Sequence, residues 1–224
     1  MSQASAVRLA VFDCDGTLVD SQADICAAMD EAFASAGLAP PDRHDTRRIV
    51  GLSLPQAIRR LHPGGEARDH AALCERYAAA YRARRASGVL AEPLYEGIAG
   101  LLEALHANGW LLGVATGKSD RGLAHCLAGH GVDQLFVTLQ TADRHPSKPH
   151  PAMLQAALAA TGAAPADSVM IGDTAYDMAM AQGAGVRAIG VGWGYHGAHE
   201  LIAAGAVAVA EDAAGLLALI EERA

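Results

Sequence analysis

Two aspartates lie two residues apart near the start of the chain. The stretch LAVFDCDGTLVDS, residues 9–21, places Asp13 and Asp15 at the end of an apolar run. Carboxylates this close repel each other, and their burial costs desolvation free energy. A divalent cation among them makes the arrangement favourable. Because the cluster consists of oxygen ligands, it indicates Mg²⁺, which is usually bound together with a substrate phosphate.

Other polar residues stand where further apolar runs end. Thr116 and Gly117 close one run, and Asp173 follows another, with Asp177 four residues later. Lys148 stands just before a helix-like stretch. Ligands bind at the carboxyl ends of strands in open α/β sheets, so we expect these side chains at one edge. Asp173 and Asp177 can then face the same metal.

This set of residues predicts phosphoryl-group chemistry. Asp13 is a candidate nucleophile that would form an aspartyl-phosphate. Asp15 can protonate the leaving oxygen and afterwards activate water. Thr116 offers a hydroxyl and Gly117 backbone N–H groups to the phosphate, and Lys148 offers a point charge.

The elements that must position these residues alternate along the chain. Apolar runs predict strands, and amphipathic stretches such as 96–109 and 150–162 predict helices between them. This alternation predicts the α/β class, with a parallel sheet covered on both faces. The runs are 7–13, 110–116, 135–139, 168–173, 187–192 and 206–210.

One long segment interrupts the alternation. No convincing strand occurs between residues 20 and 88, where 21–37, 54–62 and 66–88 read as helices. We therefore expect an α/β catalytic core with an inserted all-helical domain. The core comprises 1–19 and 89–224, and the insertion comprises 20–88.

Composition limits the partners that we expect. The 224 residues carry a net charge of −8, which argues against nucleic acid as a partner. No apolar run reaches the roughly 18 residues that a membrane helix needs, and no signal peptide is recognisable. We expect a cytoplasmic monomer or homodimer that binds a small phosphorylated metabolite.

The sequence resembles the haloacid dehalogenase-like hydrolases. Four segments carry the resemblance: FDCDGTLVDS at 12–21, VATGKS at 114–119, Lys148 in SKPHP, and GDTAYD at 172–177. The resemblance implies a Rossmann-like core with a helical cap of the family's type-one kind. It also implies that Mg²⁺ is held by Asp13, the backbone carbonyl of Asp15 and Asp173, with support from Asp177.

Within that family the sequence looks most like the phosphatases, near the phosphoglycolate phosphatases. Dehalogenases lack an acid at the position of Asp15, and the phosphonate-cleaving branch needs a cap lysine that this chain does not have. A sugar-phosphate mutase remains an alternative. A phospho-accepting signalling protein without turnover is an alternative from another class, although the chain length and the motif order argue against it.

The segment DTRRIVGLSLPQAI, residues 45–58, is the expected specificity loop of the cap. Gly51 would allow a tight bend there. Arg47 or Arg48 could pair with a carboxylate or second phosphate of the substrate. Two solvent-facing arginines on a short helix are an equally good interpretation.

Overall fold

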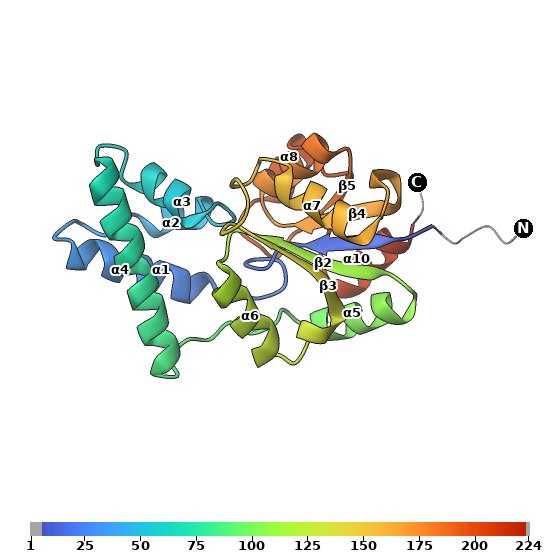
Figure 1. Ribbon diagram of the computed structural model, residues 1–224, viewed down its shortest axis with the longest axis horizontal. Coiled ribbons are helices and arrows are strands. Elements are labelled where there is room, and N and C mark those ends of the chain that lie inside the picture. The colour runs from blue at the N-terminus through green and yellow to red at the C-terminus, as the bar shows by residue number, and fades with distance from the viewer. Residues whose placement is uncertain (1–5, 223–224) are drawn as a thin grey trace, which may run out of the picture.

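A parallel β-sheet forms the centre of the computed structural model, which describes residues 6–222 (Figure 1). Its strands lie in the order β3-β2-β1-β4-β5-β6, and every pairing between neighbours is parallel. Each strand overlaps one of the six predicted apolar runs, so the predicted α/β class is confirmed. The bounds are β1 Leu9–Phe12, β2 Leu111–Thr116, β3 Phe136–Thr141, β4 Ser168–Gly172, β5 Arg187–Val191 and β6 Ala208–Ala210.

The two faces of the sheet are covered by different helices, because successive strand side chains point to opposite sides. Ala10 and Phe12 pack with α5, α6 and α10 on one face, and Leu9 and Val11 pack with α7, α8 and α9 on the other. All four side chains are fully buried, which explains why β1 is apolar along its whole length. The bounds are α5 Ile98–Ala107, α6 Asp120–Gly129, η1 Asp133–Leu135, α7 Ala152–Thr161, η2 Pro165–Asp167, α8 Ala175–Ala184, α9 Ala198–Ala203 and α10 Ala213–Glu221.

The sheet has a topological switch point between β1 and β4. After β1 the chain builds β2 and β3 on one side, and then crosses back to place β4 on the other side of β1. Asp13 extends this pairing, since its N–H donates to the carbonyl of Ile171 at 2.9 Å. Ligands bind outside the carboxyl ends of the strands at such a switch point.

Four of the five helices between β1 and β2, α1 to α4, form a separate group, which we call the helical insert (Figure 1). They pack around an apolar cluster of their own, built on Met29, Phe33, Ile58 and Leu73. Within the described part of the chain, no helix has both the length and the apolar character needed to cross a bilayer. The bounds are α1 Gln22–Ser35, α2 Arg43–Arg48, α3 Leu54–Leu61 and α4 Ala67–Ala86.

Helix α2 was predicted only in the interpretation that places Arg47 and Arg48 on a short helix. Its sequence, RHDTRR, has no apolar periodicity from which a helix could be recognised. Asp42 caps its first turn, because the Asp42 side chain accepts a hydrogen bond from the N–H of His44 at 2.6 Å. The element is therefore fixed by a cap and by tertiary packing, with Thr46 fully buried.

Several contacts join the helical insert to the core, among them one set at its ends and one along the loop before α3. At its ends, the N–H of Asp20 donates to the carbonyl of Pro93 at 2.9 Å, beside an antiparallel bridge between Val19 and Leu94. Farther along, the N–H of Ser53 donates to Ser147 Oγ at 2.7 Å. These contacts hold the loop before α3 over the carboxyl edge of the sheet.

Candidate active site

Three buried carboxylates meet beyond the carboxyl ends of β1 and β4. Asp13, Asp173 and Asp177 each place one oxygen within 4.8 Å of the other two. Lys148 Nζ lies 2.9 Å from Asp13 Oδ1 and 2.6 Å from Asp177 Oδ1. All four side chains are buried. A single ammonium group thus contacts two of the three acids, and the sequence-predicted residues of three separate segments lie together.

One oxygen of Asp13 has no hydrogen-bond partner among the described residues. Its Oδ1 pairs with Lys148 and accepts a hydrogen bond from the N–H of Cys14 at 2.6 Å. Its Oδ2 is buried, and no residue within 6–222 donates a hydrogen bond to it. Burial raises the pKa of Asp13, the positive charge of Lys148 lowers it, and the negative charge of Asp177 raises it. The net result is a pKa of about 7. An unpaired buried anion is costly, so this oxygen is suited to a cation or a reacting phosphorus atom.

Asp173 is held rigidly by two donors. Thr17 Oγ1 donates to its Oδ1 at 2.9 Å, and the N–H of Tyr195 donates to its Oδ2 at 2.9 Å. Burial, followed by the nearby charge of Asp13, raises the pKa of Asp173 well above its ordinary value. Hard carboxylate oxygens whose negative charge is only partly compensated fit a divalent cation such as Mg²⁺.

Asp177 is positioned by the start of α8. Thr174 is the N-cap of this helix, and its backbone N–H and its hydroxyl both donate to Asp177 Oδ2, at 3.1 and 2.7 Å. The two residues form a capping box, in which each side chain satisfies a backbone donor of the other. The other oxygen, Oδ1, remains directed at Lys148. The local sequence TAYD therefore fixes one wall of the acidic cluster.

Thr116 and Gly117 lie at the end of β2, next to β1 in the sheet. Thr116 is buried, and its Oγ1 accepts a hydrogen bond from the N–H of Lys118 at 3.3 Å. A Cβ at Gly117 would lie 2.9 Å from the carbonyl oxygen of Gly51, so only glycine fits beneath the loop of the helical insert. Gly51 itself adopts φ +93°, which agrees with the predicted tight bend.

Asp15 points away from the acidic cluster. Its Oδ1 lies 2.9 Å from Lys118 Nζ and accepts a hydrogen bond from Ser21 Oγ. Lys118 Nζ also lies 2.6 Å from Glu92 Oε1. Lys118 was missing from the predicted site, although it directly follows Gly117 and is one of only two lysines in the chain. Its rarity and its position at a strand end were the available signal.

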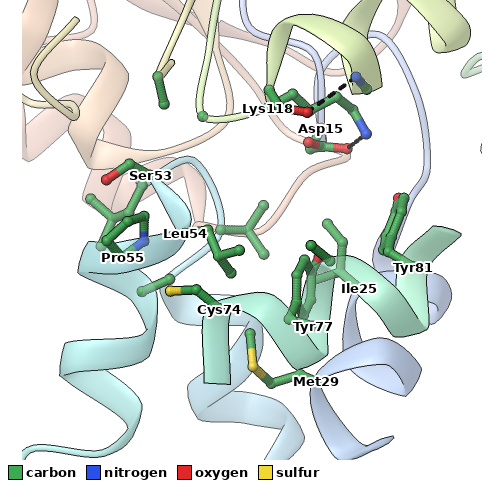
Figure 2. Close-up of a pocket in the computed structure, with 18 of the residues that line it drawn as sticks. Asp15, Ile25, Met29, Ser53, Leu54, Pro55, Cys74, Tyr77, Tyr81 and Lys118 are labelled. Atoms are coloured by element: carbon green, nitrogen blue, oxygen red, sulfur yellow. Dashed lines mark hydrogen bonds and ion pairs between the residues drawn. The ribbon is translucent and has the colours of Figure 1, made fainter. Parts of the chain in front are cut away.

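A cavity of about 690 Å³ lies between the core and the helical insert (Figure 2). Asp15 and Lys118 lie on one side of it, and Tyr77, Tyr81 and other residues of the insert lie on the other. Gly51 also lines the cavity. The cavity therefore runs from the strand ends toward the insert.

Arg47 and Arg48, either of which could pair with substrate in one of the two interpretations of the sequence, do not line this cavity. The guanidinium of Arg48 donates to both carboxylate oxygens of Glu200, at 2.8 and 2.7 Å. Tyr176 Oη donates to the carbonyl of Arg48 at 3.1 Å. The charge of Arg48 is thus used to join the helical insert to the core. The sequence RHDTRR alone does not indicate that the Arg48 side chain pairs with Glu200.

An aromatic loop after β5 was not predicted to belong to the site. In this loop, residues 192–197, Trp193 Nε1 donates to the carbonyl of Thr17 at 3.2 Å, and Tyr195 holds Asp173. A Cβ at Gly16, which adopts φ +86°, would overlap the ring of Tyr195. The signal was its position at the same sheet edge as the other motifs.

The chain is similar to several known proteins. The family model of haloacid dehalogenase-like hydrolases matches residues 10–191. A probable phosphatase, IndB, of Dickeya dadantii (strain 3937) is 36% identical over 203 residues, covering 88% of this chain and 86% of that protein. A phosphoglycolate phosphatase of Pseudomonas fluorescens (strain Pf0-1) is 32% identical over 198 residues, covering 84% and 71%. The crystal structure of a hydrolase from Pseudomonas syringae has a TM-score of 0.85 and 27% identity, covering 97% of this chain and 99% of that one.

Proposed function

Since the chain belongs to the haloacid dehalogenase-like hydrolases and is a phosphatase, we propose that it hydrolyses a small phosphomonoester through an aspartyl-phosphate on Asp13, with Mg²⁺ at the acidic cluster. The observation that carries the proposal is the buried Oδ2 of Asp13 beside Lys148, an oxygen that accepts no hydrogen bond from the part of the chain that the structure describes. With one oxygen held and one free, this carboxylate can serve as nucleophile and as metal ligand.

In the first step, an oxygen of Asp13 attacks phosphorus and the bond from phosphorus to the alcohol oxygen breaks. Asp15 gives its proton to the departing alcohol. In the second step, Asp15 takes a proton from water, the water oxygen attacks phosphorus, and the carboxylate of Asp13 is regenerated as inorganic phosphate leaves. Such acid–base help is typically worth about 10²–10⁴-fold.

The remaining residues bind and orient. Thr116, Gly117 and Lys148 hold the phosphate by a hydroxyl, a backbone N–H and a charge. Asp13, the backbone carbonyl of Asp15 and Asp173 would hold Mg²⁺, with Asp177 in support. The ion, when bound, neutralises charge on the transferring phosphoryl group.

The proposal includes the organisation of the enzyme. Residues 1–19 and 89–224 form the catalytic core, and residues 20–88 form the cap that covers it. The partner is a small phosphorylated metabolite, and the enzyme acts in the cytoplasm as a monomer or homodimer. Phosphoglycolate, named for several relatives, is the reference compound against which other phosphomonoesters are compared.

Release of inorganic phosphate from a panel of phosphomonoesters tests the proposal. Each compound is assayed with Mg²⁺, with EDTA, and with the Asp13→Asn variant. We expect release that needs the metal and is lost in that variant. Asp133→Asn is the matched control, because it removes an exposed acid outside the site. If folded wild-type protein releases no phosphate from any compound, the proposal is wrong, and isomerised sugar phosphates become the next product to seek.

A further inference from the structure

The cavity between the core and the helical insert is large for a two-carbon substrate. Its volume of about 690 Å³ lies in the range of about 300–1,000 Å³ that is typical of sites for drug-sized ligands. In the proposed function the phosphate binds at the strand ends, beside Asp13 and Thr116. The cavity is then left for the alcohol part of the substrate.

The side of the cavity that faces Asp15 is mainly apolar (Figure 2). Its side chains come from three helices of the insert, and together they would gain free energy by removing apolar ligand surface from water. A short polar leaving group would leave most of these side chains without a contact. They are Ile25 and Met29 of α1, Leu54 and Pro55 of α3, and Tyr77 and Tyr81 of α4.

The two tyrosines favour a flat ligand. The ring centroids of Tyr77 and Tyr81 are 5.7 Å apart, with an angle of 30° between the ring planes. Tyr81 is fixed, because its hydroxyl donates to Glu92 Oε1 at 2.7 Å. An aromatic ring placed against this pair gains stacking or edge contacts beyond the area that it buries.

The cations at this cavity do not favour a small carboxylate. Lys118 is paired with Asp15 and Glu92, and Arg85 lies 3.2 Å from Glu92 Oε2. Arg82 and Arg121 also line the cavity, but both are exposed. A carboxylate in the buried part would therefore compete with Asp15 and Glu92 for cations that they already neutralise.

Resting on the proposed phosphatase function, we infer that this cavity binds the alcohol part of an aromatic or heteroaromatic phosphomonoester in preference to that of a two-carbon acid. The phosphate is held at the strand ends, and the aromatic body lies between Asp15 and the tyrosines of α4. Hydrolysis then releases an aromatic or heteroaromatic alcohol.

Binding of two non-hydrolysable analogues tests the inference without depending on turnover. Benzylphosphonate replaces the ester oxygen of phenyl phosphate by a methylene, and 3-phosphonopropionate does the same for phosphoglycolate. Each is titrated calorimetrically into the wild-type chain with Mg²⁺. We expect benzylphosphonate to bind about tenfold more tightly or better, since a single methylene in an apolar pocket is already worth about 10-fold or more. Equal affinities, or tighter binding of 3-phosphonopropionate, would overturn the inference.

Two neighbouring alanines of α4 provide the matched variants. Ala78 lines the cavity, whereas Ala79 is exposed and does not. Ala78→Leu fills the space, so the preference for benzylphosphonate should fall about tenfold. Ala79→Leu should leave it as in the wild type. If both variants keep the preference, the ligand binds elsewhere and the inference is wrong.

Turnover separates this inference from the proposed function. The kcat/KM for phenyl phosphate should be about tenfold higher than that for phosphoglycolate. This ratio should fall in Ala78→Leu. Phosphate release that is fastest from phosphoglycolate contradicts the inference but supports the phosphatase. Preferential binding of benzylphosphonate without any phosphate release supports the inference and contradicts the phosphatase.

Discussion

Lys118 Nζ lies 2.9 Å from Asp15 Oδ1, and the same ammonium lies 2.6 Å from Glu92 Oε1. Asp15 follows β1, Lys118 follows β2, and Glu92 belongs to the segment that returns from the helical insert. Tyr81 and Arg85 of α4 also contact Glu92. The proposed acid–base residue is therefore oriented by a lysine that the helical insert helps to hold.

Lys118→Met should lower kcat about 10–100-fold, because a misplaced acid–base group loses the alignment that proton transfer needs. KM should change less than kcat, since Lys118 is proposed to position Asp15 and not the phosphate. Steady-state kinetics on one substrate measures both. Lys118→Arg, which keeps the charge, should restore part of the rate. Unchanged kcat in Lys118→Met would show that Asp15 is oriented without it.

The pair between Arg48 and Glu200 should stabilise the contact of the helical insert with the core. A double-mutant cycle with Arg48→Ala and Glu200→Ala, followed by urea unfolding, should give a coupling of about 0.2–1 kcal/mol, as expected for a partly exposed pair. The coupling should shrink as salt concentration rises. Zero coupling at low salt would contradict the structural role assigned to Arg48.

The same pair predicts a pH dependence. The hydrogen bond from Arg48, and then that from the N–H of Gly197, lower the pKa of Glu200 from 4.5 to about 2. Because the pKa of Glu200 is lower in the folded state, the contribution of this carboxylate to stability is fully present above pH 4.5. It is lost as pH falls through about 2. The coupling should therefore be the same at pH 7 and pH 6 and smaller at pH 3. A coupling energy that increases below pH 4 would contradict the lowered pKa of Glu200.

Mg²⁺ should raise the thermal stability of the protein. Binding to the folded state alone stabilises by about 2.7 kcal/mol when the ion is at 100 times its Kd. In Asp173→Asn the increase in Tm on adding Mg²⁺ should disappear, and in Asp133→Asn it should remain. Differential scanning fluorimetry with Mg²⁺ and with EDTA provides the comparison. A wild-type Tm that does not change when Mg²⁺ is added would argue against the acidic cluster as the Mg²⁺ site.

Gly194 should be intolerant of any side chain. A Cβ at this position would overlap the side chain of Asp173, which the next residue, Tyr195, holds by its backbone N–H. Gly194→Ala should therefore abolish the Mg²⁺ effect on Tm and reduce activity. Gly100→Ala is the matched control, since a Cβ there meets no atom within 4 Å, and it should add about 0.5–1 kcal/mol of helix stability. Equal effects of both variants would show that the loop after β5 does not position Asp173.

Much of this architecture could be predicted from the sequence, because local patterns determine it. Continuous apolar runs identify parallel strands buried on both faces, and strand ends identify the edge where Asp13, Lys148 and Asp173 lie together. What remained unpredicted depends on contacts between distant segments. The partner of Lys118 is set by how the insert returns to the core, and the partner of Arg48 by the placement of α9. No periodicity in either segment encodes those distances.

Trapping the phosphorylated enzyme tests the central claim most directly. The Asp15→Asn variant lacks the proposed acid and base. With phenyl phosphate, whose phenolate leaves without full protonation, the second step should slow more than the first, and the intermediate should accumulate. The variant is incubated with this substrate and Mg²⁺, quenched in acid, digested and sequenced by mass spectrometry. We expect one phosphoryl group on Asp13, and none when Asp13→Asn is added to Asp15→Asn. A phosphoryl group on another residue, or phosphate release that persists in Asp13→Asn, would contradict it.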